Sequence, residues 1–168
     1  TANIVIDNAT VTGQSGSAIV VGDYDGRTIA NIDLRNGTTL NAGNGDIVVV
    51  NDTAEARLKV DNSHLSGNIS NGAQSTASVA LSNNSSLTGI LNNVTSMTLD
   101  NTSALTLTGD SSVGELNNGG NIVLNSTDNS VGKTLTINGN YTGLAGSAVS
   151  MNVALAGDDS LTDKLVIK

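Results

Sequence analysis

The chain has 168 residues, of which 38% are hydrophobic and only 1% aromatic, and Phe, Trp, Pro and Cys are absent. Its net charge of −8, from 15 acidic and 7 basic residues, excludes the basic surface that nucleic-acid binding needs. With no Cys and one His, it lacks a disulfide framework, a thiol nucleophile and enough ligands for an ordinary zinc site. No apolar run is long enough to span a bilayer, so no membrane-spanning helix is predicted.

One short phrase recurs along the first two thirds of the chain: apolar, any residue, apolar, polar, Asn. Its copies are Ile4–Asn8, Ile32–Asn36, Leu58–Asn62, Val79–Asn83 and Met97–Asn101. Their second apolar residues are Ile6, Leu34, Val60, Leu81 and Leu99, so the interval between successive copies shortens steadily along the chain. Alternating apolar and polar residues predict strands, and a recurrence about every twenty residues predicts a solenoid.

The residues after each strand favour a sharp corner. Asn tolerates left-handed backbone angles, and its amide can form a hydrogen-bonded ladder with the same Asn in the next rung. We expect Gly13, Gly67, Gly89 and Gly109 at other corners that need positive φ. No stretch sustains a helical period. The predicted fold is therefore all-β, a right-handed parallel β-helix (solenoid) in which longer intervals loop out of the rungs.

The spacing changes after Leu116. Apolar pairs come closer together, and Val149, Met151, Val153 and Leu155 alternate with other residues along one segment. We expect hairpins that close the end of the solenoid, because an open last rung would leave an unpaired sheet edge. The expected organisation is one continuous domain, with β-helix rungs over 1–115 and a C-terminal hairpin-like cap over 116–168.

The most specific motifs lie between Leu116 and Lys168. They are Leu116–Gly120 with Ile122 and Leu124, then Gly132–Ile137, Gly139–Tyr141, the alternating segment Val149–Leu155, and Asp158–Ile167. Together they resemble the C-terminal end of the passenger domain of Gram-negative autotransporters (type V secretion), in the pertactin-like and self-associating-adhesin group. The resemblance covers about a third of the chain, whereas residues 1–115 match only as generic rungs.

This resemblance implies a right-handed β-helix that is exported through the periplasm and displayed on the bacterial cell surface. It also implies a partner, an outer-membrane β-barrel translocator further along the same polypeptide. The matched region resembles an autochaperone, which folds early and templates the rungs above it. The implied folding motif consists of Gly139, Asn140, Tyr141, Asp163, Lys164 and Leu165. Because the chain begins with Thr1 rather than Met and stops abruptly at Lys168, we expect it to be a fragment of a longer passenger.

Few residues suggest chemistry. His64 occupies a place held in other copies by Thr10, Thr39 and Ser86, which predicts an ordinary corner residue. No Gly-x-Ser-x-Gly elbow is present, so a Ser-His-Asp hydrolase is not predicted. A calcium site near Asp163 is not expected either, because the Gly-Gly-x-Gly-x-Asp repeat of calcium-binding solenoids is missing.

The loop that begins at Gly22 supplies the remaining candidates. Asp23, Tyr24, Asp25 and Arg27 are candidates for surface binding, and an acidic group with Arg would also suit an enzyme that acts on polysaccharides. Asp46 and Asp52 could form a second such group. The simpler interpretation is that these are polar loop residues. We therefore expect no catalytic residue, no cofactor and no metal.

The sequence thus predicts a surface-displayed structural stalk and adhesin rather than an enzyme, with a C-terminal end that promotes passenger folding. Its expected work is adhesion, aggregation or biofilm formation. Expected partners are the translocator, a second copy of the chain bound through polar ladders, and host or matrix glycans or proteins. The alternative is a polysaccharide-binding or polysaccharide-degrading β-helix protein.

Overall fold

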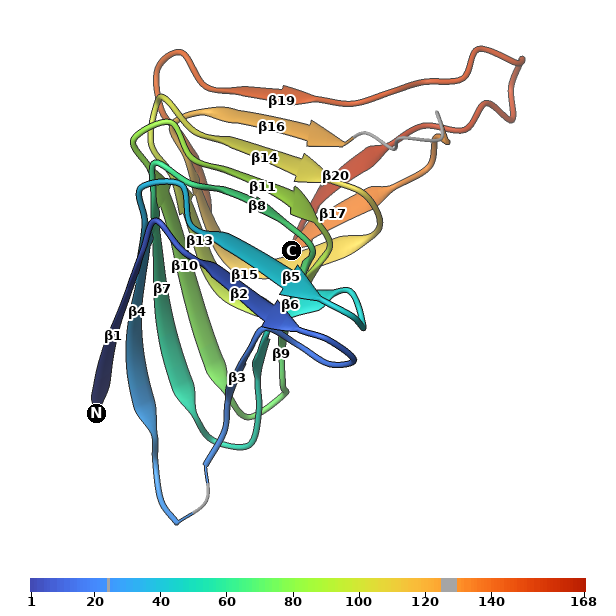
Figure 1. Cartoon of the computed structure of the whole chain (residues 1–168). Coiled ribbons are helices and arrows are strands. Elements are labelled where there is room, and N and C mark those ends of the chain that lie inside the picture. The colour runs from blue at the N-terminus through green and yellow to red at the C-terminus, as the bar shows by residue number, and fades with distance from the viewer. Residues whose placement is uncertain (24, 125–129) are drawn as a thin grey trace.

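The computed structural model describes residues 1–23, 25–124 and 130–168. This part of the chain forms 20 strands connected by turns and loops (Figure 1). It contains no helix of the length and apolarity needed to cross a membrane. Strands far apart in the sequence pair in parallel and stack into a rod with three faces. The predicted parallel β-helix is confirmed.

The first face is a nine-stranded sheet that runs the length of the rod. Its order is β1 (Ala2–Asp7), β4 (Ile29–Arg35), β7 (Glu55–Asp61), β10 (Thr76–Ser82), β13 (Val94–Leu99), β15 (Ser111–Asn118), β17 (Thr134–Ile137) and β20 (Lys164–Ile167), with β18 (Tyr141–Gly143) also paired to β15. The register aligns the apolar positions of successive copies. Ile6, Leu34, Val60, Leu81 and Leu99 lie side by side in turn. The intervals between copies of the recurring phrase are therefore the lengths of successive rungs.

The other two faces are built from shorter strands. The second face contains β2 (Thr10–Gly13), β5 (Thr39–Ala42), β8 (His64–Ser66), β11 (Ser86–Gly89), β14 (Ala104–Leu107), β16 (Asn121–Leu124) and β19 (Ala148–Ser150). The third contains β3 (Ile19–Val21), β6 (Asp46–Val50), β9 (Asn68–Asn71) and β12 (Leu91–Asn92). One turn through the three faces makes one rung.

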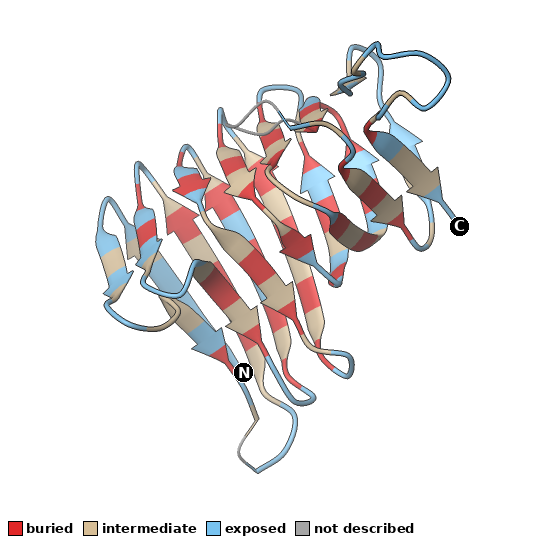
Figure 2. Ribbon diagram, turned by 90° about the vertical axis from the view of Figure 1, so that its right-hand side faces the viewer, coloured by how far each residue is buried: buried red, intermediate tan, exposed pale blue. Residues whose placement is uncertain are grey.

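The core is a narrow column of aliphatic side chains. In β10, Ala77, Val79 and Leu81 are buried, whereas the alternate residues Ser78 and Ala80 are half-buried and face outward. Figure 2 shows the same alternation of buried and less buried bands along the strands of successive rungs. Adjacent rungs are only about 4.8 Å apart, which favours branched aliphatic side chains over large rings. Each fully buried Leu, Ile or Val contributes about 1.5–3 kcal/mol.

The corners after β1, β4, β7 and β10 have the predicted backbone, whereas Asn101, after β13, has no positive φ. Asn8, Asn36, Asn62 and Asn83 have φ angles of 49°, 55°, 44° and 53°. The predicted ladder of Asn with Asn is wrong at these corners. The Asn36 side-chain amide donates to the Asp7 carboxylate at 2.9 Å, and that of Asn83 donates to Asp61 at 2.6 Å. A carboxylate is the stronger acceptor, so it takes the amide hydrogen of the next rung.

The prediction for the four glycines holds only for Gly67, which has a φ of 140°. Gly89 has no positive φ, yet a Cβ there would lie 2.0 Å from the carbonyl oxygen of Gly67 in the neighbouring rung. Gly13 and Gly109 also lack positive φ, and a Cβ on either would come within 3 Å of a neighbouring atom. Close approach of the backbone, rather than backbone angle, requires Gly13 and Gly89, whereas the neighbour of Gly109 is the flexible end of the Ile90 side chain.

The cap continues the parallel stacking further than expected. Strands β18, β19 and β20 pair in parallel with β15, β16 and β17. The hairpin-like element is limited to an excursion over 151–163, in which Val153 and Thr162 form an antiparallel bridge. The predicted strand over Val149–Leu155 is wrong beyond Ser150, and Leu155 is 93% exposed. Within the described residues, no further strand covers this excursion. The division between 115 and 116 stays a prediction.

Candidate functional site

The carboxylate of Asp163 joins three separate segments of the cap. Asp163 is 3% exposed and immediately precedes β20. One oxygen accepts hydrogen bonds from the backbone N–H groups of Gly132 and Lys133, both at 2.9 Å. The other oxygen accepts the backbone N–H of Asn152 at 2.8 Å. The start of β17, the segment after β19 and the start of β20 therefore share one buried acceptor.

The surroundings of Asp163 keep it ionised. Burial opposes the charged form, but the hydrogen bonds from Asn152, Lys133 and Gly132 and the positive charge of Lys133 outweigh it. The pKa of Asp163 is therefore lowered from its ordinary value. Lys133 is itself buried, and its ammonium donates to the carbonyl and hydroxyl oxygens of Ser130 at 3.0 and 3.1 Å. The cap thus contains a buried carboxylate whose charge is satisfied by neighbouring donors.

The residues Gly139, Asn140 and Tyr141 lie where the chain enters β18. Tyr141 is partly buried against the core, beside Leu116 of β15 in the register. The Leu116 N–H donates to the carbonyl oxygen of Asn140 at 3.0 Å. A Cβ on Gly139 would lie 2.8 Å from the carbonyl oxygen of Gly114, so this turn sits closely on β15.

The residues Lys164 and Leu165 lie on β20, against β17. The Lys164 N–H donates to the carbonyl oxygen of Lys133 at 2.8 Å, and half-buried Leu165 lies beside Leu135. The six predicted motif residues therefore form two groups, one at each end of β17. The partners of Asp163 were not predicted, because a backbone N–H has no signature in the sequence.

Asp100 connects a corner of one rung to the next, and the sequence did not predict this role. It accepts the backbone N–H of Asn83 in the preceding rung at 2.8 Å. In its own turn it accepts the Thr102 N–H at 2.9 Å and the Ser103 hydroxyl at 2.8 Å. Burial opposes ionisation, but these donors lower the pKa of Asp100 to about 2. An Asp followed two residues later by Thr is the turn signal that could have found it.

In the loop near Gly22, the candidate Asp23 faces its own loop and the next rung. Its carboxylate accepts the backbone N–H of Thr28 and the hydroxyl of Thr53. The Thr53 hydroxyl is the main cause of the lowered pKa of Asp23. The acidic group is therefore engaged in holding the loop.

The other loop candidates do not converge on Asp23. The Arg27 guanidinium donates to Glu55 at 2.6 Å, and Asp25 is exposed. Tyr24 lies outside the described residues. Asp23 and Arg27 therefore form hydrogen bonds with different residues, and their role in surface binding stays a prediction.

The remaining acidic residues and His64 form no centre for a metal. Within the part of the chain that the structure describes, no three His, Asp or Glu side chains are placed to hold an ion together. His64 lies on β8, and its Nδ1 is 2.7 Å from the hydroxyl of Ser86, its register partner in the next rung. His64 and Ser86 therefore occupy equivalent positions, as predicted, but both lie within strands, so the prediction of a corner residue is wrong.

Comparison with known proteins shows which family the C-terminal part of the chain matches. Residues 111–168 match the model of the family described as Autochaperone Domain Type 1. A stretch of 44 residues, 26% of this chain, is 54% identical to the autotransporter adhesin AIDA-I of Escherichia coli. The matched stretch is 3% of the length of that relative. No solved structure matches the chain significantly.

Proposed function

We propose that this chain, which is a segment of an autotransporter passenger ending in a type 1 autochaperone domain, is a structural stalk and adhesin whose C-terminal end promotes passenger folding. The family match confirms the resemblance seen in the sequence and places the protein at the bacterial cell surface. The observation that carries the folding proposal is the buried Asp163 carboxylate, which joins three segments of the last rungs.

A parallel β-helix has a kinetic problem that an early-folding end solves. Each first-face strand must pair with one that lies a whole rung away in the sequence, so the first rung gains few contacts for a large loss of chain entropy. A completed rung offers the next one a full set of N–H and C=O partners. The Asp163 hydrogen bonds stabilise the cap from within residues 132–163, without help from the rungs before β15.

The stalk and adhesive part of the proposal rests on the polar outer rows of the rungs. On the second face the hydroxyls of Thr10 and Thr39 lie 2.8 Å apart, and Thr88 and Thr106 are register partners two rungs further on. Such rows supply donors and acceptors for side-by-side contact with a second copy or with host or matrix molecules. In the full protein the passenger is linked to an outer-membrane translocator. We propose no enzymatic role, because Asp23 and Arg27 are held by their own loop and by Glu55.

The experiment for the folding role compares two variants near β18. Tyr141→Ala removes a half-buried ring that packs on the core, whereas Leu144→Ala changes a side chain that is 56% exposed. We expect Tyr141→Ala, and deletion of residues 133–168, to slow refolding of the chain and to reduce passenger at the surface of cells that express the full protein. Leu144→Ala should change neither. Unchanged refolding and unchanged surface levels in all three would contradict the proposal.

Self-association is tested separately, by sedimentation of the purified chain over a range of concentrations. A concentration-dependent dimer supports adhesion between copies through the polar rows. A strict monomer at high concentration would count against that part of the proposal and leave the folding role untouched.

A further inference from the structure

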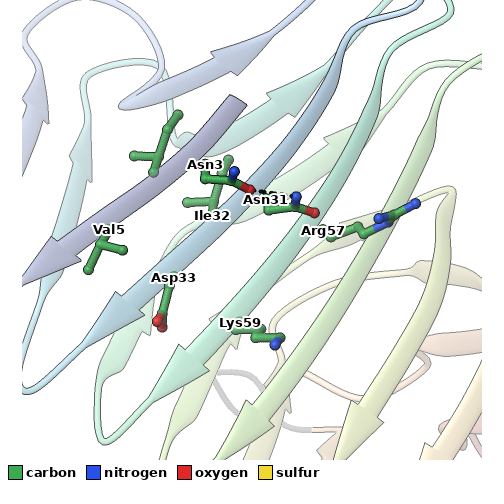
Figure 3. Close-up of a pocket in the computed structure, with 8 residues that line it drawn as sticks. Asn3, Val5, Asn31, Ile32, Asp33, Arg57 and Lys59 are labelled. Atoms are coloured by element: carbon green, nitrogen blue, oxygen red, sulfur yellow. Dashed lines mark hydrogen bonds between the residues drawn. The ribbon is translucent and has the colours of Figure 1, made fainter. Parts of the chain in front are cut away.

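A furrow crosses the first face of the rod between two rows of outward-facing side chains (Figure 3). One row begins with Asn3, Asn31 and Arg57, and the other with Val5, Asp33 and Lys59. Two hollows of about 370 and about 200 Å³ lie along it and share Arg57 and Lys59. The furrow runs from β1 to β13, which is about 19 Å at the usual strand spacing. Its shape suits an extended ligand that lies along the rod.

The lining of the furrow is positive in an otherwise acidic chain, because its charged residues are Arg57, Lys59 and one carboxylate, Asp33. Of the 7 basic residues, Arg27, Arg35, Arg57 and Lys59 lie on or next to β4 and β7, and the net charge of the whole chain is −8. The same two strands also carry Asp33, Glu55 and Asp61. An anionic ligand is therefore more attracted to this lining than to an acidic surface elsewhere on the chain.

The acidic neighbours of the furrow are contacted by arginines. Glu55 accepts hydrogen bonds from Arg27 at 2.6 Å and from Arg57 at 2.7 Å. Asp33 lies 3.7 Å from Arg35, which also pairs with Asp7 at 2.9 Å. Exposed Lys59 forms no ion pair with any residue that the structure describes. Lys59 is thus the cation of the furrow lining without an ion-pair partner among the described residues, and Asp33 is its register neighbour on β4.

Arg57 is held ready for a second partner. Its Nε and one terminal nitrogen face Glu55, which fixes the plane of the guanidinium, and the side chain is still 54% exposed. A guanidinium carries five N–H donors in a planar fork, so donors remain for a ligand carboxylate. The Asn3 and Asn31 amides, joined at 2.8 Å, and the Thr98 hydroxyl add neutral donors and acceptors along the furrow.

We propose that this furrow binds an extended polysaccharide of uronate sugars, with Lys59 and Arg57 on its carboxylates and the neutral side chains on its hydroxyls. A neutral polysaccharide fits less well, because the residues that line the furrow include no aromatic ring on which a sugar could stack. Binding at this furrow is independent of the folding role, since Lys59 lies on β7 and the hydrogen bonds of the Asp163 carboxylate lie in the cap.

The test is calorimetric titration of the chain with polygalacturonate, with dextran as the neutral comparison. We expect saturable binding of polygalacturonate that weakens as salt is added, and no binding of dextran. Lys59→Ala should weaken binding about tenfold or more, the factor for one charged hydrogen bond, whereas Lys59→Arg should retain it. Lys168→Ala, at an exposed lysine far from the furrow, is the matched control and should bind as the original chain does. Equal thermal midpoints for the variants show that the fold is kept.

Several outcomes would overturn the proposal. They are no binding of polygalacturonate, equal loss in Lys59→Ala and Lys168→Ala, or equal binding of dextran. Binding of heparin without binding of polygalacturonate would assign the furrow to sulfated chains and contradict the carboxylate assignment. Self-association that Lys59→Ala abolishes, in the absence of any polysaccharide binding, would assign it to a second copy of the chain.

Discussion

Asp163 and Asn152 form a reciprocal pair: the Asp163 carboxylate accepts the Asn152 N–H at 2.8 Å, and the Asp163 N–H donates to the Asn152 carbonyl oxygen at 2.9 Å. This pair closes the base of the excursion over 151–163. The apolar residues of the excursion, among them Val153 and Leu161, are mostly exposed and give it little core of its own. Hydrogen bonds to one buried charge, rather than a core of its own, therefore attach the excursion to the last rungs.

Asp163→Asn should destabilise the chain by about 2 kcal/mol or more. The amide keeps the shape of the carboxylate but removes the charge and points two donors toward backbone N–H groups that need acceptors. Asp158→Asn makes the same chemical change at an exposed site in the same excursion and should have almost no effect. Urea unfolding of both variants measures the difference. Equal midpoints would show that the hydrogen bonds of the Asp163 carboxylate contribute nothing to stability.

Acid should weaken the fold through Asp100 and Asp163. The pKa of Asp100 is about 2 in the fold, against an ordinary value of 3.8, and that of Asp163 is also lowered. A lowered pKa means that the unfolded chain binds protons more readily, so this contribution is complete above about pH 4 and disappears as the pH falls toward about 2. Asp100→Asn should make the urea midpoint less dependent on pH in that window. An unchanged pH dependence would contradict the assignment to Asp100.

Gly89→Ala should destabilise the chain by about 1–3 kcal/mol, the usual range for forced overpacking. The new Cβ would lie 2.0 Å from the Gly67 carbonyl oxygen, which belongs to the backbone of the neighbouring rung and has little room to move. Gly16→Ala adds the same methyl group where no atom lies within 4 Å and serves as the control. Thermal or urea unfolding that gives the two variants equal stability would refute the close approach.

A pair of Leu→Ala variants tests whether the hydrophobic core extends into the excursion over 151–163. Leu105 is 1% exposed and Leu155 is 93% exposed. Leu105→Ala should cost about 2–5 kcal/mol through lost burial and the cavity left behind. Leu155→Ala should change the free energy of unfolding by no more than about 0.5 kcal/mol. A large loss from Leu155→Ala would mean that the excursion packs against something that the described residues do not include.

The sequence predicted the rungs well because the alternation of apolar and polar residues allows only one register for each strand. A slip of one residue would turn Leu81 outward and Ser82 inward, so alternation and the recurring Asn together determine the register. The same alternation misled the prediction for Val149–Leu155, because it says that residues are suited to a strand and not that a neighbouring strand is present to cover them.

The contacts of the candidate site were harder to predict from the sequence. Asp163 was found by family resemblance, but its partners are backbone N–H groups, which nearly every residue carries. The furrow was missed because Asp33 and Lys59 become neighbours only when β4 and β7 are placed side by side. Charge spacing within one strand cannot show which charges meet across rungs.

The most direct test of the central claim is pulsed hydrogen exchange, read by mass spectrometry, while the chain refolds from urea. If the C-terminal end is the template, amide protons of β17, β18 and β20 should become protected first. Protection should then spread through β15, β13 and β10 toward β1. Protection that begins at β1 and β4, or that reaches the cap last, would contradict the claim that this end promotes the folding of the rungs before it.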